Sequence, residues 1–247
     1  MADSKISALT AATQLADTDE FVIASSGTTK RITALTMRRV LNDPVFALFG
    51  APTSSFEFES SSLTGLTALT NTPDFENANT TFPSYYYVRD NAGGSALCGR
   101  YAATPATPFT AITKMSSTMR ANNSQAGLFL SVGTPGAIEA LGLNPTAGVF
   151  QISLIRWADP STFGSTPGTY PGDTGLNYYA FRVNSTTNID SFFSYDGLVW
   201  APMLLARDPS LTIGSVGLFL VAAGTDHFAI FDYLRIWNSA LTFPGNT

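Results

Sequence analysis

The feature that most constrains the fold is a series of short apolar stretches separated by turn residues. Residues 56–59 alternate apolar and charged side chains, which is the period of two expected for a half-buried strand. Comparable stretches follow at 85–89, 109–119, 126–132, 149–157, 178–183, 189–195, 213–222 and 228–237. Turn signals such as Asp196-Gly197 and Asp208-Pro209 separate most of them. About ten strands at this spacing predict an all-β fold, an antiparallel β-sandwich.

Residues 1–43 are organised differently. An arm of small residues precedes a predicted strand at 20–24, a turn at 25–27 and a second strand at 28–32. A short helix is expected from Thr33, which suits an N-cap, and Asn42-Asp43-Pro44 is expected to end it. Residues 44–55 are interpreted as a linker into a sandwich spanning 56–247. Within that sandwich, residues 158–177 are polar and rich in Pro and Gly, which predicts one long loop.

The order K-I-S-A-L-x-A-A-T-x-L, D-x-F-V-I and T-K-R-I-T followed by a helix resembles the N-terminal attachment segment of tailed-phage virion proteins. Tail fibres, tail spikes, head fibres and capsid decorations carry such segments, and the resemblance covers roughly residues 4–41. It implies docking onto a phage particle. The residues expected to attach are Ile6, Leu9, Leu15, Phe21, Ile23, Lys30, Arg31, Leu35, Arg38 and Arg39. The alternative is an ordinary hairpin and helix that cap the following domain.

Four motifs in the second half resemble concanavalin/laminin-G-type jelly rolls. They are F-R-V-N from Phe181, S-Y-D-G-L-V-W from Ser194, V-G-L-F-L from Val216 and F-D-Y-L-R-I-W from Phe231. The similarity spans roughly residues 80–238 and implies a jelly-roll β-sandwich. It implies little about function, because this sandwich serves lectins, glycanases and inert adaptors alike.

Aromatic residues outside the expected core are candidates for glycan binding, because aromatic faces stack on the apolar faces of sugars. These candidates are Tyr85, Trp157, Tyr170 and Tyr178. The alternative for each is packing within the sandwich.

Catalytic and metal-binding patterns are not found in the sequence. Glycanases on this sandwich use an E-x-D-x-x-E triplet, which is absent here, although Asp190, Asp196 and Asp232 could still pair across strands. We interpret Asp196 instead as part of an Asp-Gly turn. The single histidine follows a turn without a nucleophile motif, and the single cysteine excludes an internal disulfide. We therefore expect no enzyme activity, no cofactor and no side-chain metal site, with loop calcium at Asp173 or Asp226 left open.

Charge and hydropathy limit the classes of partner that the chain can bind. Only 13% of residues are charged and the net charge is −5, so binding to phosphate backbones is not expected. No window is apolar enough for a membrane span or a signal peptide. The low charge favours self-association, and we expect a homotrimer.

Together these features predict a phage virion structural protein, made in the host cytoplasm. It would be a fibre or receptor-binding protein whose jelly roll binds host-surface glycan. The alternatives are a capsid decoration or cement protein without glycan binding and, less favoured, a polysaccharide-degrading enzyme.

Overall fold

The structure is a computed structural model of the 247-residue chain. It describes residues 20–25, 28–33, 43–58, 63–78, 85–90, 96–118, 122–133, 136–172, 177–223 and 226–245. The chain divides into two compact units, Met1–Gly50 and Ala51–Thr247. No described helix is long and apolar enough to cross a membrane.

The first unit contains the predicted hairpin. Strands β1 (Glu20–Ser25) and β2 (Thr28–Thr33) pair antiparallel, with Glu20 opposite Thr33. Among the residues expected to attach to a particle, Phe21, Ile23, Lys30 and Arg31 belong to these strands. Ile6, Leu9, Leu15, Leu35, Arg38 and Arg39 lie outside the described residues, as does the helix expected from residue 33, so the attachment role stays a prediction.

One helix in this unit differs from the sequence prediction. Helix α2 (Pro44–Phe49) occupies residues interpreted as a linker. The Asp43 carboxylate accepts hydrogen bonds from the backbone N–H groups of Val45 and Phe46, at 2.9 and 3.3 Å. Proline fits the first turn of a helix, where its missing N–H has no intrahelical partner. The Asp-Pro pair therefore starts a helix here, whereas the sequence pattern indicated a helix end.

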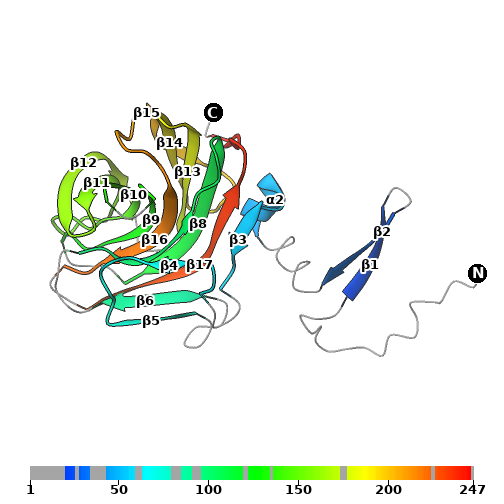
Figure 1. Cartoon of the computed structure of the whole chain (residues 1–247), viewed down its shortest axis with the longest axis horizontal. Coiled ribbons are helices and arrows are strands. Elements are labelled where there is room, and N and C mark those ends of the chain that lie inside the picture. The colour runs from blue at the N-terminus through cyan, green and yellow to red at the C-terminus, as the bar shows by residue number, and fades with distance from the viewer. Residues whose placement is uncertain are drawn as a thin grey trace, which may run out of the picture. The chain divides into compact units, whose positions relative to one another are not determined.

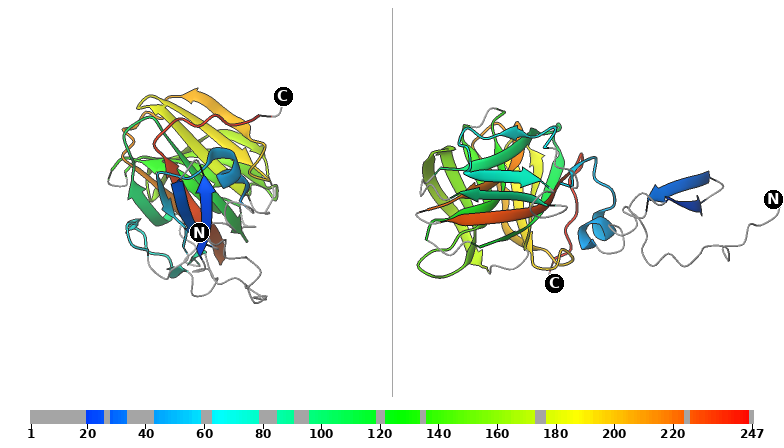
Figure 2. Two further views of the ribbon diagram at one scale, coloured as in Figure 1. Left: turned by 90° about the vertical axis from the view of Figure 1, so that its right-hand side faces the viewer. Right: turned by 90° about the horizontal axis from the view of Figure 1, so that it is seen from below.

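The second unit is a sandwich of two antiparallel sheets, as predicted (Figures 1 and 2). One sheet has seven strands in the order β12-β11-β10-β9-β16-β7-β4, and the other has eight in the order β15-β14-β13-β8-β17-β6-β5. β3 pairs with β17. The strands are β3 (Ser54–Phe56), β4 (Thr67–Ala68), β5 (Phe75–Ala78), β6 (Tyr86–Asp90), β7 (Cys98–Ala103), β8 (Phe109–Ser117), β9 (Gln125–Ser131), β10 (Ile138–Leu143), β11 (Gln151–Asp159), β12 (Thr162–Pro171), β13 (Asn177–Ser185), β14 (Asn188–Ser194), β15 (Ala201–Arg207), β16 (Ser215–Val221) and β17 (His227–Trp237).

Strand β12 occupies half of the loop predicted at 158–177. It is an edge strand that pairs only with β11 along the sheet order. An edge strand tolerates Pro167 and Pro171 because half of its backbone N–H groups have no ladder partner to lose. Its side chains are mostly exposed, so the polar composition that indicated a loop is equally compatible with an edge.

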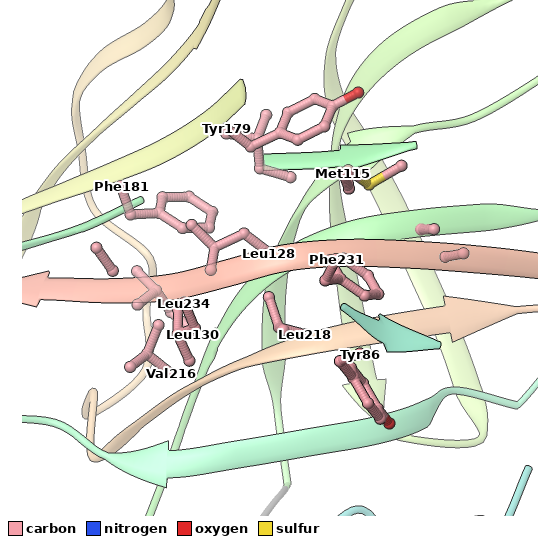
Figure 3. Packing of buried hydrophobic residues seen from close by; sticks show 14 of the residues in the cluster. Tyr86, Met115, Leu128, Leu130, Tyr179, Phe181, Val216, Leu218, Phe231 and Leu234 are labelled. Atoms are coloured by element: carbon pink, nitrogen blue, oxygen red, sulfur yellow. The ribbon is translucent and has the colours of Figure 1, made fainter. Parts of the chain in front are cut away.

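The main core lies between the two sheets. Figure 3 shows Leu128, Leu218 and Val216 of the seven-stranded sheet packing toward Phe181, Phe231 and other apolar residues of the eight-stranded sheet. Side chains in a strand alternate between its two faces, and one face of each sheet supplies this cluster. The apolar periodicity in the sequence therefore predicts the sandwich correctly.

A second apolar cluster lies on the opposite face of the seven-stranded sheet. Phe129, Ile155, Trp157 and Phe219 belong to it and are fully or nearly fully buried. A Cβ at Gly217 would lie 2.7 Å from the Phe129 ring, so glycine is required there for the ring to cross the strand. A strand that is buried on both faces has a continuous run of apolar residues in its sequence. This explains the sequences of β9 and β16.

The seven-stranded sheet curls around this second cluster. The Leu97 N–H, next to β7, donates to the Pro160 carbonyl in the β11–β12 turn at 2.7 Å. The Asn71 side chain donates to both the Leu97 and Pro160 carbonyls. Strands β10, β9 and β16 separate β11 from β7 in the sheet, so the contact requires the sheet to bend strongly (Figure 1).

Candidate functional site

A surface pocket opens where an edge of one sheet meets an edge of the other. Its volume is about 390 Å³, and we call it the Tyr170 pocket. It is lined by Tyr170, Phe193, Ser194, Tyr195, Asp196, Val199 and Ala201. Tyr170 comes from the edge strand β12, whereas the other residues come from β14, the β14–β15 turn and the start of β15. The sandwich therefore brings together residues that are about 25 positions apart in the chain.

Three aromatic rings form one side of this pocket. Tyr170 packs on Phe193 with ring centroids 5.0 Å apart, and Phe193 meets Tyr195 edge-on at 5.9 Å. Phe193 is buried, whereas Tyr170 is 48% exposed and Tyr195 is 49% exposed. The Tyr195 hydroxyl donates to the Pro171 carbonyl at 3.0 Å. Two half-exposed tyrosine rings are thus held at defined angles beside the pocket.

The turn after β14 positions a carboxylate beside these rings. Asp196 Oδ1 accepts from the backbone N–H groups of Leu198 and Val199 at 2.8 and 2.9 Å, and from the Ser194 hydroxyl. These N–H groups stabilise the ionised form, which lowers the pKa of Asp196. Gly197 has a φ of 75°, as this turn requires. The Asp-Gly turn expected from the sequence is present.

Tyr170 is the one predicted glycan-binding residue that lines this pocket. Tyr178 is buried against the Trp200 ring, with centroids 6.3 Å apart. Tyr85 is half-buried ahead of β6 and does not line the pocket. The structure therefore does not gather the predicted residues into one site.

Trp157 lines a different pocket, which we call the Trp157 pocket. Its volume is about 310 Å³, and its described lining residues are Asn123, Gln125, Trp157 and Phe163. Phe163 is opposite Trp157 in the β11–β12 pairing, and their rings meet edge-on at 5.7 Å. The two pockets share no described lining residue.

The residues missed in the sequence analysis are Phe193, Tyr195 and Val199. They belong to the S-x-D-G-x-x-W motif or precede it directly. The indole nitrogen of Trp200 donates a hydrogen bond to the Gly197 carbonyl and so stabilises the turn. Tyr195 and Val199 of this turn are therefore exposed, while Asp196 and Trp200 hold its backbone. The turn motif was the signal available for finding them.

The carboxylates considered for a cross-strand pair are held by basic residues or by the turn. Asp190 accepts from Arg182 at 2.8 Å and from the Ala206 N–H at 2.7 Å. Asp232 pairs with Lys114 at 3.0 Å. Asp196 is the carboxylate that lines the Tyr170 pocket among the described residues. This pocket therefore combines apolar ring faces with one ionised oxygen acceptor.

Metal-ligating groups do not cluster in the described part of the chain, where no three His, Cys, Asp or Glu side chains come together. Asp226, one of two positions left open for loop calcium, forms a two-point ion pair with Arg89, with both N–O distances 2.7 Å. Asp173, the other, lies outside the described residues. His227 is buried, and burial lowers its pKa.

Comparisons with known proteins identify the fold. No protein-family model and no curated protein matches the sequence. A solved GH43 protein from Bacillus licheniformis aligns with a TM-score of 0.64 at 18% identity, over 75% of this chain and 39% of that chain. A xylan β-1,4-xylosidase from Bacillus halodurans aligns with a TM-score of 0.58 at 14% identity, over 74% and 38%. A functionally unknown protein from Saccharomyces cerevisiae aligns with a TM-score of 0.55 at 15% identity, over 71% and 97%.

These matches correct the functional interpretation of the sequence. The first matched structures are GH43 glycoside hydrolases and not virion proteins, so the interpretation as a phage fibre, receptor-binding or decoration protein is wrong. The expectation that the chain is not an enzyme is wrong for the same reason, because chains that contain this fold include glycoside hydrolases. The chain spans about two fifths of the length of those hydrolases, and at these identities the likeness is one of fold.

Proposed function

We propose that residues 51–247 form a carbohydrate-binding module, which holds a polysaccharide segment at the Tyr170 pocket. The observation that carries this proposal is the pair of half-exposed tyrosines, Tyr170 and Tyr195, fixed beside the ionised Asp196. A pyranose or furanose ring has apolar C–H faces and hydroxyl edges. Aromatic faces suit the former, and a carboxylate accepts from the latter.

The rigidity of the site supports this proposal. Tyr195 is held by its bond to the Pro171 carbonyl, and Tyr170 rests on the buried Phe193 ring. Tyrosine supplies a large contact area with few rotatable bonds, so little conformational entropy is lost on binding.

The matched structures suggest the class of polysaccharide. They include a xylan β-1,4-xylosidase, a GH43 protein of a xyloglucan locus and a GH43 enzyme engineered to display both endo-xylanase and exo-arabinofuranosidase activity. We propose that the module binds plant-type xylan, arabinoxylan or xyloglucan, as part of a polysaccharide-degrading system. The resemblance of residues 4–41 to attachment segments and the expected homotrimer stay predictions from the sequence.

Affinity electrophoresis in gels that contain xylan, arabinoxylan or xyloglucan tests this proposal, with dextran as a comparison polymer. Retardation is expected in at least one of the three gels. Tyr170→Ala and Tyr195→Ala should each weaken binding about tenfold, because each removes one stacking ring. Phe75→Ala is a matched control, since Phe75 is 44% exposed and lies outside the pocket.

The proposal fails if none of the three polymers retards the protein. It also fails if the double variant Tyr170→Ala/Tyr195→Ala is retarded as strongly as the unaltered chain.

A further inference from the structure

The Trp157 pocket has features that the Tyr170 pocket lacks. Gln125 begins β9 and Trp157 lies near the end of β11, and both belong to the face of the seven-stranded sheet that carries the second apolar cluster. Phe163 begins β12 and is 50% exposed. Asn123 precedes β9 in the left-handed region, with a φ of 67°. The curled sheet therefore gathers residues from three strands and a turn around one pocket.

Two buried polar atoms of this pocket have no hydrogen-bond partner among the described residues. They are the indole nitrogen Nε1 of Trp157, a donor, and the amide oxygen Oε1 of Gln125, an acceptor. Trp157 is 2% exposed and Gln125 is 3% exposed. Buried polar groups in proteins are nearly always paired, because an unmet donor or acceptor loses its bonds to water without replacement. Both unmet groups belong to residues that line the same pocket.

The chemistry of the lining selects a class of ligand. The described lining residues are two aromatic rings and two amides, none of them charged, so the ligand that fits is neutral. A hydroxyl group both accepts and donates, which suits a pocket whose lining residues carry one unpaired N–H donor and one unpaired carbonyl acceptor. A volume of about 310 Å³ is adequate for one sugar ring.

We infer that the Trp157 pocket binds a single neutral sugar residue, such as a chain end or a side branch of the polysaccharide. This inference rests on the proposed function for the class of ligand. In it, sugar hydroxyls accept from Trp157 Nε1 and donate to Gln125 Oε1, and the C–H face of the sugar contacts Phe163. The protein then has two sugar sites, one for an internal segment and one for a terminal unit.

The experiment uses the full chain with free D-xylose, L-arabinose, D-glucose and D-galactose as probes. Binding is followed by the shift in thermal midpoint and by tryptophan fluorescence. At least one sugar should raise the midpoint in a saturable manner. Gln125→Met keeps the side-chain length but removes the unpaired acceptor. It should leave the sugar-free midpoint unchanged or higher and weaken sugar binding at least tenfold.

Two control variants test whether these effects are specific to the Trp157 pocket. Ser117→Ala removes a buried hydroxyl that also has no hydrogen-bond partner among the described residues. Because Ser117 is not among the residues that line the pocket, sugar binding should be unchanged. Tyr170→Ala should weaken polysaccharide binding and leave free-sugar binding unchanged. The inference is overturned if all four sugars leave the midpoint unchanged, or if Gln125→Met binds sugar as the unaltered chain does.

The outcomes distinguish this inference from the proposed function. Retention on polysaccharide gels without a free-sugar response overturns the inference and leaves the Tyr170 pocket as proposed. A free-sugar response that depends on Gln125, without retention on any gel, supports the Trp157 pocket and overturns the Tyr170 pocket.

Discussion

The Tyr170 pocket and the Trp157 pocket both contain a residue of strand β12, but they differ in whether their polar groups are hydrogen-bonded within the protein. In the Tyr170 pocket, the Tyr195 hydroxyl and Asp196 Oδ1 are bonded within the protein. In the Trp157 pocket, Trp157 Nε1 and Gln125 Oε1 are buried and have no hydrogen-bond partner within the described part of the chain. The first pocket is therefore a preformed surface that selects by ring faces, whereas the second has polar groups for a ligand to satisfy. Four substitutions and one pH series test this difference.

The largest effect is expected for Phe193→Ala. Phe193 is 2% exposed and supports both Tyr170 and Tyr195. Its removal should lower the free energy of unfolding by about 3–5 kcal/mol, as for other buried phenylalanines, and abolish retention on polysaccharide. Chemical denaturation measures the first effect. Phe163→Ala, at a half-exposed ring of the other pocket, should cost less than about 1 kcal/mol. If both variants lost the same free energy of unfolding, the distinction between a buried supporting ring and a half-exposed ring would not hold.

An intermediate effect is expected for Asp196→Asn, and it bears on pH. The pKa of Asp196 is lowered in the folded chain by the N–H groups of Val199 and Leu198. The unfolded value is about 3.9. Because the folded pKa is the lower one, this stabilisation is fully present above about pH 4 and is lost as the pH falls through the folded pKa. Asp196→Asn should lower the free energy of unfolding at pH 7 by about 1 kcal/mol.

The pH dependence of ligand binding should also differ between the two pockets. Polysaccharide binding is expected to be constant from pH 8 to about pH 4 and to weaken below that, as Asp196 becomes protonated. The described lining of the Trp157 pocket contains no titratable side chain, so free-sugar binding should not change over the range in which the chain stays folded. Affinity electrophoresis and midpoint shifts across pH provide the two profiles. Parallel profiles would contradict the separation of the two sites.

The smallest effect is expected for Tyr195→Phe. This variant keeps the ring but removes the hydrogen bond to the Pro171 carbonyl. Because a typical net hydrogen bond contributes about 1 kcal/mol, polysaccharide affinity should fall less than tenfold, and less than in Tyr195→Ala. Calorimetric titration with a soluble oligosaccharide can resolve this difference. A loss as large as that of the alanine variant would mean that the hydroxyl, and not the ring face, holds the ligand.

The sandwich was predictable because the burial of one or both faces of a strand fixes the spacing of apolar residues in its sequence. Continuous apolar runs mark β9 and β16, which are buried on both faces. The alternation at residues 56–59 predicted a strand there, but β3 ends at Phe56, and Glu57 and Phe58 lie outside the strands. The failures occurred where one local pattern fits two structures. Gly164, Pro167, Gly168 and Pro171 indicated a loop but belong to the edge strand β12. Asp43-Pro44 indicated a helix end but forms a helix start.

Tyr170 was found from its type and surroundings, whereas Tyr195 was overlooked within a motif used only to identify the fold. Tyr178 shows the limit of the same reasoning, because it is buried against Trp200. Trp157 was selected as a partner of Tyr170 but lines a separate pocket. Composition can indicate which side chains suit a sugar, but exposure and neighbours depend on how the two sheets meet.

The amino-acid pattern by itself determined that this chain forms antiparallel strands around an apolar core, because side-chain periodicity follows directly from strand geometry. Only the tertiary structure decided which aromatic residues are exposed and how the edges of the two sheets create the Tyr170 pocket. It also decided that Gln125 Oε1 and Trp157 Nε1 are buried without a hydrogen-bond partner among the described residues. These properties depend on contacts between residues far apart in the chain, and local sequence does not encode such distances.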